Sequence, residues 1–222
     1  MGQTRDRLLR DLWGGRDPFA GFPRNLYEVD LQGWGFQHPW LTETVAALRP
    51  QHVLEVGVWK GASVVRMAGA LRDLGIDGAV IAVDTWLGSA EHWLHGLEEL
   101  GMENGRPALQ KKFMNNILAE DLADHVVPLP LDSLNAAHVL GARGIGLDMI
   151  HLDGGHDYAI VMADLHAWWP LVRPGGALIG DDYYVTGDWP GVKQAFDEYF
   201  AVHAPGLLEF GGSKCRIRKP PS

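Results

Sequence analysis

The sequence predicts a doubly wound α/β fold, in which helices cover both faces of a mainly parallel sheet. Short apolar runs of strand length alternate with helix-like stretches over most of the 222 residues. A helix between two strands carries the chain back across the sheet, so that the strands run parallel. Because no internal repeat and no Pro, Gly or Ser-rich linker divides this alternation, one main domain is expected.

Five apolar runs are the predicted parallel strands: Val53–Val56, Val80–Val83, Val126–Leu129, Met149–Leu152 and Ala177–Ile179. Three helices are predicted between and after them: Ala62–Leu74, Tyr158–Leu171 and Gly191–Phe200. The turn Arg173-Pro-Gly-Gly176 is expected to end the second of these helices.

The last part of the chain predicts an antiparallel hairpin over Leu207–Ile217, broken at Gly211-Gly212. In its second half Lys214, Arg216 and Arg218 alternate with Cys215 and Ile217, which indicates a strand with its charged side chains in water. The single cysteine is therefore expected to be an inert packing residue.

Residues 1–45 do not follow the alternation. They are rich in Trp, Phe and Pro, and we expect an N-terminal cap or lid ahead of a cofactor-binding domain over residues 46–222. Residues 88–116 are a second predicted insertion. Because an aromatic segment can also pack against another subunit, a homo-oligomer stays open.

The composition excludes some classes of partner. A formal charge of −9 argues against a nucleic-acid binder, because phosphate affinity comes largely from clustered Lys and Arg. The sequence has neither a signal-like start nor the ~20 apolar residues that a membrane span needs. A cytoplasmic protein acting on a small molecule is the expectation.

A glycine-containing turn, Leu54-Glu-Val-Gly-Val-Trp-Lys-Gly-Ala-Ser63, joins the first strand to the next helix. Gly57 and Gly61 let the backbone pass close to a ligand, although dinucleotide sites use a similar turn. Glu55 in the strand and Asp84 after the next one favour a cofactor with a cationic amino acid and a ribose diol. The alternatives are a turn or helix-capping role for Asp84 and a buried pair between Glu55 and Lys60.

Acids and a histidine gather at the predicted ends of the fourth and fifth strands, in His151-Leu-Asp-Gly-Gly-His-Asp-Tyr158 and Gly180-Asp-Asp-Tyr183. Ligands of open α/β sheets bind beyond the carboxyl ends of the strands. Carboxylates that converge there repel one another unless a cation neutralises them. Oxygen ligands favour Mg²⁺, or else Mn²⁺ or Ca²⁺. The alternative is that these residues only cap a helix and satisfy a turn.

On these motifs the chain resembles the class I S-adenosylmethionine-dependent methyltransferases over roughly residues 50–200. The E-x-G-x-x-x-G-x-S form is similar to that of the metal-dependent macrocin-type sugar O-methyltransferases and their cephalosporin hydroxylase-like relatives. The resemblance implies a Rossmann-like seven-stranded sheet. It also implies that Gly57 contacts the methionine part of the cofactor, Asp84 its ribose, and Asp132 with Ser133 its adenine. The expected cofactor contacts are Glu55, Gly57, Gly61, Ser63, Asp84, Thr85, Trp86, Asp132, Ser133 and Asp153.

The resemblance further implies a divalent metal and a general base. In those enzymes an Asp of an L-D-x-x-H-x-Y-like motif and two acids 28 and 29 residues later hold the metal, and Asp153, Asp181 and Asp182 match this spacing. His156 stands where part of the family has its base, with Asp157 as a competitor. Asp153 and His156 are the expected catalytic residues, in methyl transfer to a hydroxyl of a sugar or natural product.

Two other functions stay open from the sequence. His151, Asp153 and His156 supply the two-His-one-carboxylate set of a non-haem iron oxygenase, although that leaves the later acid pair unexplained. The second open function is that of a protein that binds S-adenosylmethionine without catalysing a reaction. The tryptophans of predicted loops, which are candidates for lining a pocket, are Trp34, Trp86, Trp93 and Trp189.

Overall fold

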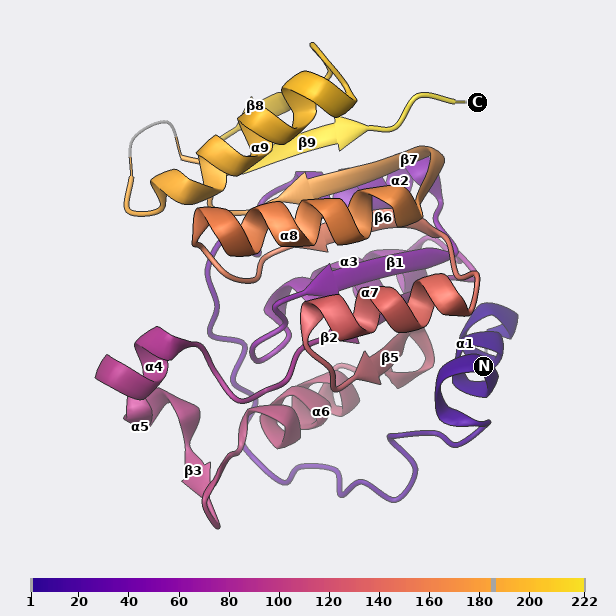
Figure 1. Ribbon diagram of the computed structural model, residues 1–222. Helices are drawn as coiled ribbons and strands as arrows, with labels where there is room; N and C mark the ends of the chain where they lie inside the picture. Colours follow the sequence, from indigo (N-terminus) through magenta and orange to yellow (C-terminus); the bar gives the residue numbers. More distant parts are fainter. Residues whose placement is uncertain (1, 185–186, 222) are drawn as a thin grey trace.

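The computed structural model of the chain describes residues 2–184 and 187–221. Its main sheet has the strand order β5-β2-β1-β6-β7-β9-β8 (Figure 1). The strands β5 to β7 in this order pair in parallel, whereas β9 is antiparallel to both neighbours. The predicted doubly wound fold, with seven strands and a C-terminal antiparallel hairpin, is confirmed. The bounds are β1 His52–Val56, β2 Ala79–Val83, β5 Val126–Leu129, β6 Leu147–Leu152, β7 Val172–Gly180, β8 Glu209–Gly211 and β9 Lys214–Arg218.

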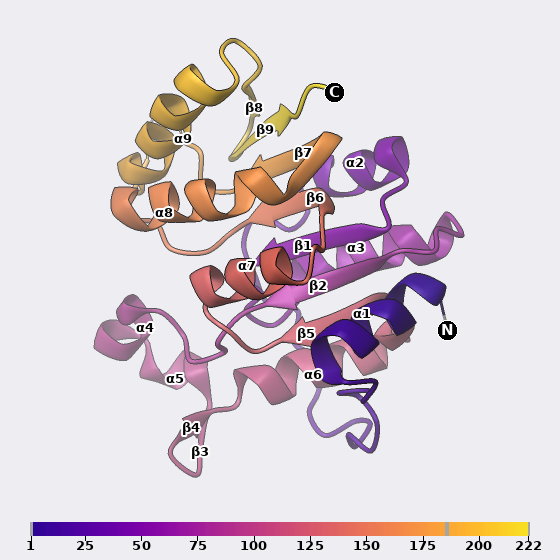
Figure 2. The same cartoon turned by 45° about the vertical axis from the view of Figure 1, so that its right-hand side comes forward.

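Helices cover both faces of the sheet (Figures 1 and 2). One layer contains α7 (Ser133–Ala142), α8 (Tyr158–Trp168) and α9 (Pro190–His203), and the other contains α2 (Trp40–Leu48), α3 (Ala62–Asp73) and α6 (Leu109–Ala119). Every residue of β1, β2 and β5 is buried, as expected for aliphatic strands enclosed on both faces. Two hydrophobic cores result, one on each side of the sheet.

The predicted N-terminal cap is divided between several places. Helix α1 (Gln3–Trp13) lies beside the edge strand β5, where the indole of Trp13 donates to the Pro128 carbonyl at 2.9 Å. Helix α2 packs against α3 within the helical layer. Residues 32–36 alone among these first 45 residues reach the cavity described below.

The predicted second insertion holds α4 (Ala90–His95), α5 (Leu97–Leu100) and a two-stranded sheet of β3 (Met102–Glu103) and β4 (Arg106–Pro107). In Figure 1 these elements lie on the side toward which the parallel strands point. The remainder of that insertion is the start of α6, a helix of the main fold. The 3-10 turns are η1 (Ala123–His125) and η2 (Trp169–Leu171).

Two local expectations were wrong. The segment Arg173-Pro-Gly-Gly176 does not separate helix from strand but lies inside β7. The register between β7 and its neighbour β6 shifts between Leu147 and Met149 of β6 to accommodate this segment. Lys214 does not face water: its side chain is completely buried, because it has an acidic partner inside the sheet. Cys215 is buried as expected, and burial raises the pKa of its thiol. No helix of the described residues combines the length and apolar character of a membrane span.

Candidate active site

A cavity of about 920 Å³ opens at the carboxyl ends of the parallel strands. The ends of β1, β2, β5, β6 and β7 form its floor, and segments 32–36, 88–92 and 187–189 form its walls. This volume is at the upper end of the range for small-molecule sites. Most of the predicted site residues line it: Gly57, Ser63, Asp84, Thr85, Asp132, Ser133, Asp153, His156, Asp157, Asp181 and Asp182. Of the loop tryptophans, Trp34 and Trp189 do so too.

Gly57 is required by the backbone geometry of the floor. Its φ is +83°, and a Cβ atom there would lie 1.8 Å from the Asp153 carbonyl oxygen. The turn after β1 is in fact tied to both neighbouring strands, since Gly57 donates to Val83 and Asp153 donates to Val56. No side chain fits at position 57 without moving the end of β6.

Asp84 organises the glycine turn from the end of β2. One carboxylate oxygen accepts the backbone N–H groups of Val58 at 2.8 Å and Trp59 at 2.9 Å, and the other accepts that of Trp86 at 2.7 Å. Burial raises the pKa of Asp84, while these donors oppose the shift. Asp84 therefore has the role in the turn that was one alternative from the sequence, and it also lines the cavity.

Three expected cofactor contacts lie outside the cavity. Trp86 is buried against Phe113 and donates to the Trp59 carbonyl at 3.0 Å, so it supports the turn from the core. Gly61 begins α3, where a Cβ atom would lie 2.7 Å from the Phe113 ring. Both residues are thus required by packing and not by a ligand.

Glu55 is the third expected cofactor contact that lies outside the cavity, and its side chain is completely buried. It accepts a hydrogen bond from Ser63 and lies 2.8 Å from Nδ1 of His151. The alternative pair of Glu55 with Lys60 does not form, because the Lys60 ammonium lies 2.7 Å from Asp30 instead.

The Asp132–Ser133 pair makes the contacts of a turn that begins a helix. Asp132 caps α7 by accepting from the Asn135 N–H at 3.0 Å. Ser133 donates to Asp164 at 2.5 Å and accepts from the Trp168 indole at 2.8 Å. Asp164, which the sequence analysis missed, also lines the cavity, and burial raises its pKa to about 6. An acid within the apolar stretch of α8 was the signal that could have revealed it.

We expect the buried Asp164 carboxyl to make stability depend on pH. Because its pKa is raised, Asp164 keeps its proton in the folded state at pH values where it has lost it in the unfolded state. The contribution of Asp164 to the free energy of unfolding therefore declines from about pH 4 to pH 6 and stays low above pH 6. Asp164→Asn should therefore gain up to about 3 kcal/mol relative to the parent between pH 4 and pH 7. Denaturant unfolding at several pH values measures this, with the exposed Glu43→Gln as control; a constant difference would contradict it.

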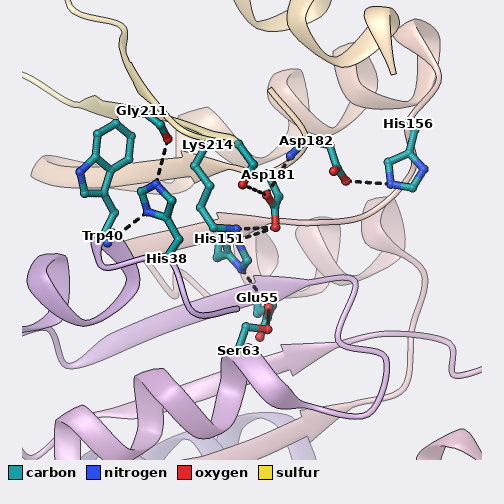
Figure 3. A network of polar contacts seen from close by, with 11 residues as sticks. His38, Trp40, Glu55, Ser63, His151, His156, Asp181, Asp182, Gly211 and Lys214 are labelled. Atoms are coloured by element: carbon teal, nitrogen blue, oxygen red, sulfur yellow. Dashed lines mark hydrogen bonds and ion pairs between the residues drawn. The ribbon is translucent and has the colours of Figure 1, made fainter. Parts of the chain in front are cut away.

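A chain of buried polar side chains runs beneath the cavity (Figure 3). From Ser63 and Glu55 it continues through His151, whose Nε2 lies 3.0 Å from the Lys214 ammonium, to an ion pair between Lys214 and Asp181. Burial raises the pKa of Glu55 to about 8, and burial together with Lys214 lowers that of His151. The ion pair of this chain is the one between Lys214 and Asp181.

Replacing Lys214 should be costly because it leaves Asp181 as a buried charge without its partner. We expect Lys214→Met to lower the free energy of unfolding by about 3–5 kcal/mol. Arg218→Met, an exposed cation on the same strand, is the matched control and should change it by less than about 1 kcal/mol. Chemical denaturation of both variants tests this, and an equal effect of the two would refute it.

The predicted metal ligands meet at the ends of β6 and β7. Burial and the neighbouring Asp181 carboxylate raise the pKa of Asp153 well above its usual value. The Asp182 N–H donates to Asp181 Oδ1 at 2.9 Å, and Asp182 itself has a φ of +53°. Figure 3 shows its carboxylate turned away from Lys214 and toward His156. Asp182, like Asp181, adds to the raised pKa of Asp153 through space.

His156 lies at the rim between an acid and an aromatic ring. Its Nε2 is 3.1 Å from Asp182 Oδ2, and this contact raises the pKa of the imidazole. The ring stacks on Trp189 at 4.2 Å between centroids. Both contacts hold the imidazole at the cavity while leaving it partly exposed.

Another set of possible metal ligands lies deeper. Within the described residues, Glu55, His151 and Asp153 place one ligand atom each within 4.8 Å of one another. However, both ring nitrogens of His151 already face partners, Nδ1 the Glu55 carboxylate and Nε2 the Lys214 ammonium, so His151 has no nitrogen left for a metal. The same contacts count against an iron site at His151, Asp153 and His156.

Comparison with known proteins decides the family. Residues 54–183 match the family model described as a methyltransferase domain. The chain belongs to this family. An uncharacterized protein of Sinorhizobium fredii, y4gI, is 27% identical over 176 residues, which are 75% of this chain and 18% of that protein. The chain thus spans less than a fifth of that relative.

Solved structures of O-methyltransferases share the fold. NovP is 25% identical, with a TM-score of 0.58 over 81% of this chain and 76% of that chain. The calicheamicin methyltransferase CalS11 is 18% identical, with a TM-score of 0.59 over 97% and 93%. TomG of Streptomyces achromogenes, in complex with S-adenosylmethionine, is 14% identical, with a TM-score of 0.58 over 99% and 91%. Residues 54–183 are therefore a methyltransferase domain with the fold that these O-methyltransferases share.

Proposed function

We propose that the domain methylates a hydroxyl of a sugar or other natural product with the help of a divalent cation held by Asp153, Asp181 and Asp182. The observation that carries this proposal is that β6 and β7 pair side by side with Leu152 opposite Gly180, so that Asp153 and Asp181 follow neighbouring strand ends. Burial and Asp181 also raise the pKa of Asp153, as expected for carboxylates that repel one another. Such repulsion is relieved by a hard cation, and carboxylate oxygens are its preferred ligands. When bound, the cation would lower the pKa of an acceptor hydroxyl.

Within this proposal the cofactor occupies the half of the cavity near the glycine turn. Gly57 gives it access to the floor, Asp84 faces its ribose, and Asp132 with Ser133 faces its adenine. Thr85 and Ser63 line the same half. The methyl group then points toward Asp153 and His156.

His156 is the proposed base. It takes the proton of the acceptor hydroxyl, the oxygen bonds to the methyl carbon, and the carbon–sulfur bond of the cofactor breaks to leave S-adenosylhomocysteine. Asp182 and Trp189 hold the imidazole in place for this transfer. Much of the rate enhancement would come from positioning and from exclusion of water. Asp157 also lines the cavity and is the competing base.

The sugar acceptor is suggested by the calicheamicin enzyme, which is named as a TDP-rhamnose 3'-O-methyltransferase. The test measures release of S-adenosylhomocysteine over a panel of glycosides and catechols, with Mg²⁺ and again after chelation. We expect chelation to lower turnover at least about 100-fold, because the carboxylates then repel one another and the hydroxyl keeps its ordinary pKa. Turnover unchanged by chelation would refute metal dependence while leaving methyl transfer in place.

A further inference from the structure

The charge of the cavity restricts what the acceptor can be. Nine of the residues that line it are Asp or Glu, and none is Lys or Arg. The two residues of the neighbouring loop outside the described part of the chain are Val185 and Thr186, which carry no charge. A concave site lined by one sign of charge concentrates ligands of the opposite sign and repels those of the same sign.

Basic side chains behind the wall do not reverse this charge. The Lys60 ammonium pairs with Asp30 at 2.7 Å, and Lys214 is completely buried beside Asp181. Each is neutralised by its own carboxylate. In the proposed function, the sulfonium of the cofactor and a divalent cation would offset the charge of the acids expected to hold them, such as Asp153.

Three further acids lie on the walls around the proposed base. Asp157 and Asp188 are exposed neighbours in sequence of His156 and Trp189, and Glu91 is an exposed acid on the wall formed by residues 88–92. These three acids come from three different segments of the chain, and all of them line the cavity. A ligand whose hydroxyl reaches His156 therefore has several carboxylates beside it.

The walls next to these acids are aromatic. Trp189 stacks on His156. Trp59 of the glycine turn stacks on His92 of α4 at 4.5 Å and lies 6.1 Å from Trp34. Carboxylates together with indole rings are the surroundings that favour an organic cation, through ion pairing and cation–π attraction. A phosphate or carboxylate would find no Lys or Arg among the described residues that line the cavity.

We propose that the acceptor carries a protonated amine near its reacting hydroxyl, as in an amino sugar or a catechol amine, and no phosphate or carboxylate. This rests on the proposed function and narrows it. A nucleotide-diphosphate sugar such as the one named for the calicheamicin enzyme is then a poor ligand here. Glu91 and Asp188 would be specificity-determining residues that sense the amine.

The test is a calorimetric titration of the protein saturated with S-adenosylhomocysteine and Mg²⁺, using probes matched in size but not in charge. One set is dopamine, methylcatechol and dihydroxyphenylacetate, and the other is methyl glucosaminide, methyl glucoside and methyl glucuronide. We expect the amine of at least one set to bind about tenfold more tightly than its neutral analogue, with the carboxylate weakest. Added salt should reduce the preference.

The double variant Glu91→Gln, Asp188→Asn should lose this preference, whereas Glu98→Gln, an exposed acid of the same insertion that does not line the cavity, should keep it. A neutral or anionic analogue that binds as tightly as the amine, or failure of both amines to bind, would overturn the proposal. Failure of S-adenosylhomocysteine itself to bind would instead count against the proposed function.

Discussion

Gly57→Ala should weaken binding of S-adenosylhomocysteine at least about 100-fold. The new methyl group would lie 1.8 Å from the Asp153 carbonyl, so either the turn or the end of β6 must move. Both are parts of the cavity floor, and the residue would also keep a φ of +83°, which side chains disfavour. Calorimetry measures the affinity, and circular dichroism checks that the variant is folded.

The matched control is Gly69→Ala in α3. There a new Cβ atom meets nothing within 4 Å, and alanine is the better helix former by about 1 kcal/mol. This variant should bind S-adenosylhomocysteine like the parent protein and unfold at the same or a higher temperature. Unimpaired binding by Gly57→Ala would show that the turn after β1 is not part of the cofactor site.

Asp153→Asn should lower turnover by about 10³-fold or more, which corresponds to about 4 kcal/mol of activation free energy. The substitution keeps the size of the side chain and its backbone hydrogen bond to Val56. It removes the carboxylate that is central to the proposed cation site. Binding of S-adenosylhomocysteine should change only a few-fold, because the glycine turn and Asp84 are untouched.

The two effects are separated by measuring turnover and product binding on the same preparation. Asp73→Asn, an exposed acid at the end of α3, is the control and should leave both unchanged. Near-normal turnover by Asp153→Asn would remove the metal and this carboxylate from the mechanism. Loss of both turnover and binding would show that Asp153 acts mainly through the shape of the floor.

The fold could be predicted because its strands are strongly apolar. The runs at Val80–Val83 and Val126–Leu129 are buried on both faces, and such strands show themselves in sequence without help from their partners. Helix α7 (Ser133–Ala142) was missed because the residues at its start, Asp132 and Ser133, were interpreted as cofactor contacts after β5. The predicted strand at Ala177–Ile179 is shorter than β7 because Pro174, Gly175 and Gly176 resemble a turn in the sequence. Only the pairing with β6 shows that they belong to an irregular strand.

The site could be predicted where residues follow the ends of strands. Asp84, Asp153 and Asp181 each come directly after a strand and so had to lie at one edge of the sheet. Contacts between distant parts of the chain could not be predicted. Lys214 follows a pattern that indicates an exposed strand, and only the fold places it against Asp181.

Trp86 was predicted to contact the cofactor because it lies in a loop. In the structure it instead packs against Phe113 in the core. The direction of a side chain at a turn depends on the backbone angles, and Trp86 has a φ of +52° that sequence did not indicate. Walls of the cavity such as segment 32–36 were likewise assigned to a general cap. Their place beside the glycine turn depends on tertiary packing.

The central claim is tested most directly by titrating the protein with S-adenosylhomocysteine in a calorimeter, first with Mg²⁺ and then with excess chelator. No acceptor needs to be known for this experiment. We expect micromolar binding that is lost in Gly57→Ala and Asp84→Ala, since the first closes the floor and the second releases the turn. Absence of binding under both conditions would contradict the cofactor site and, with it, the account of the cavity given above.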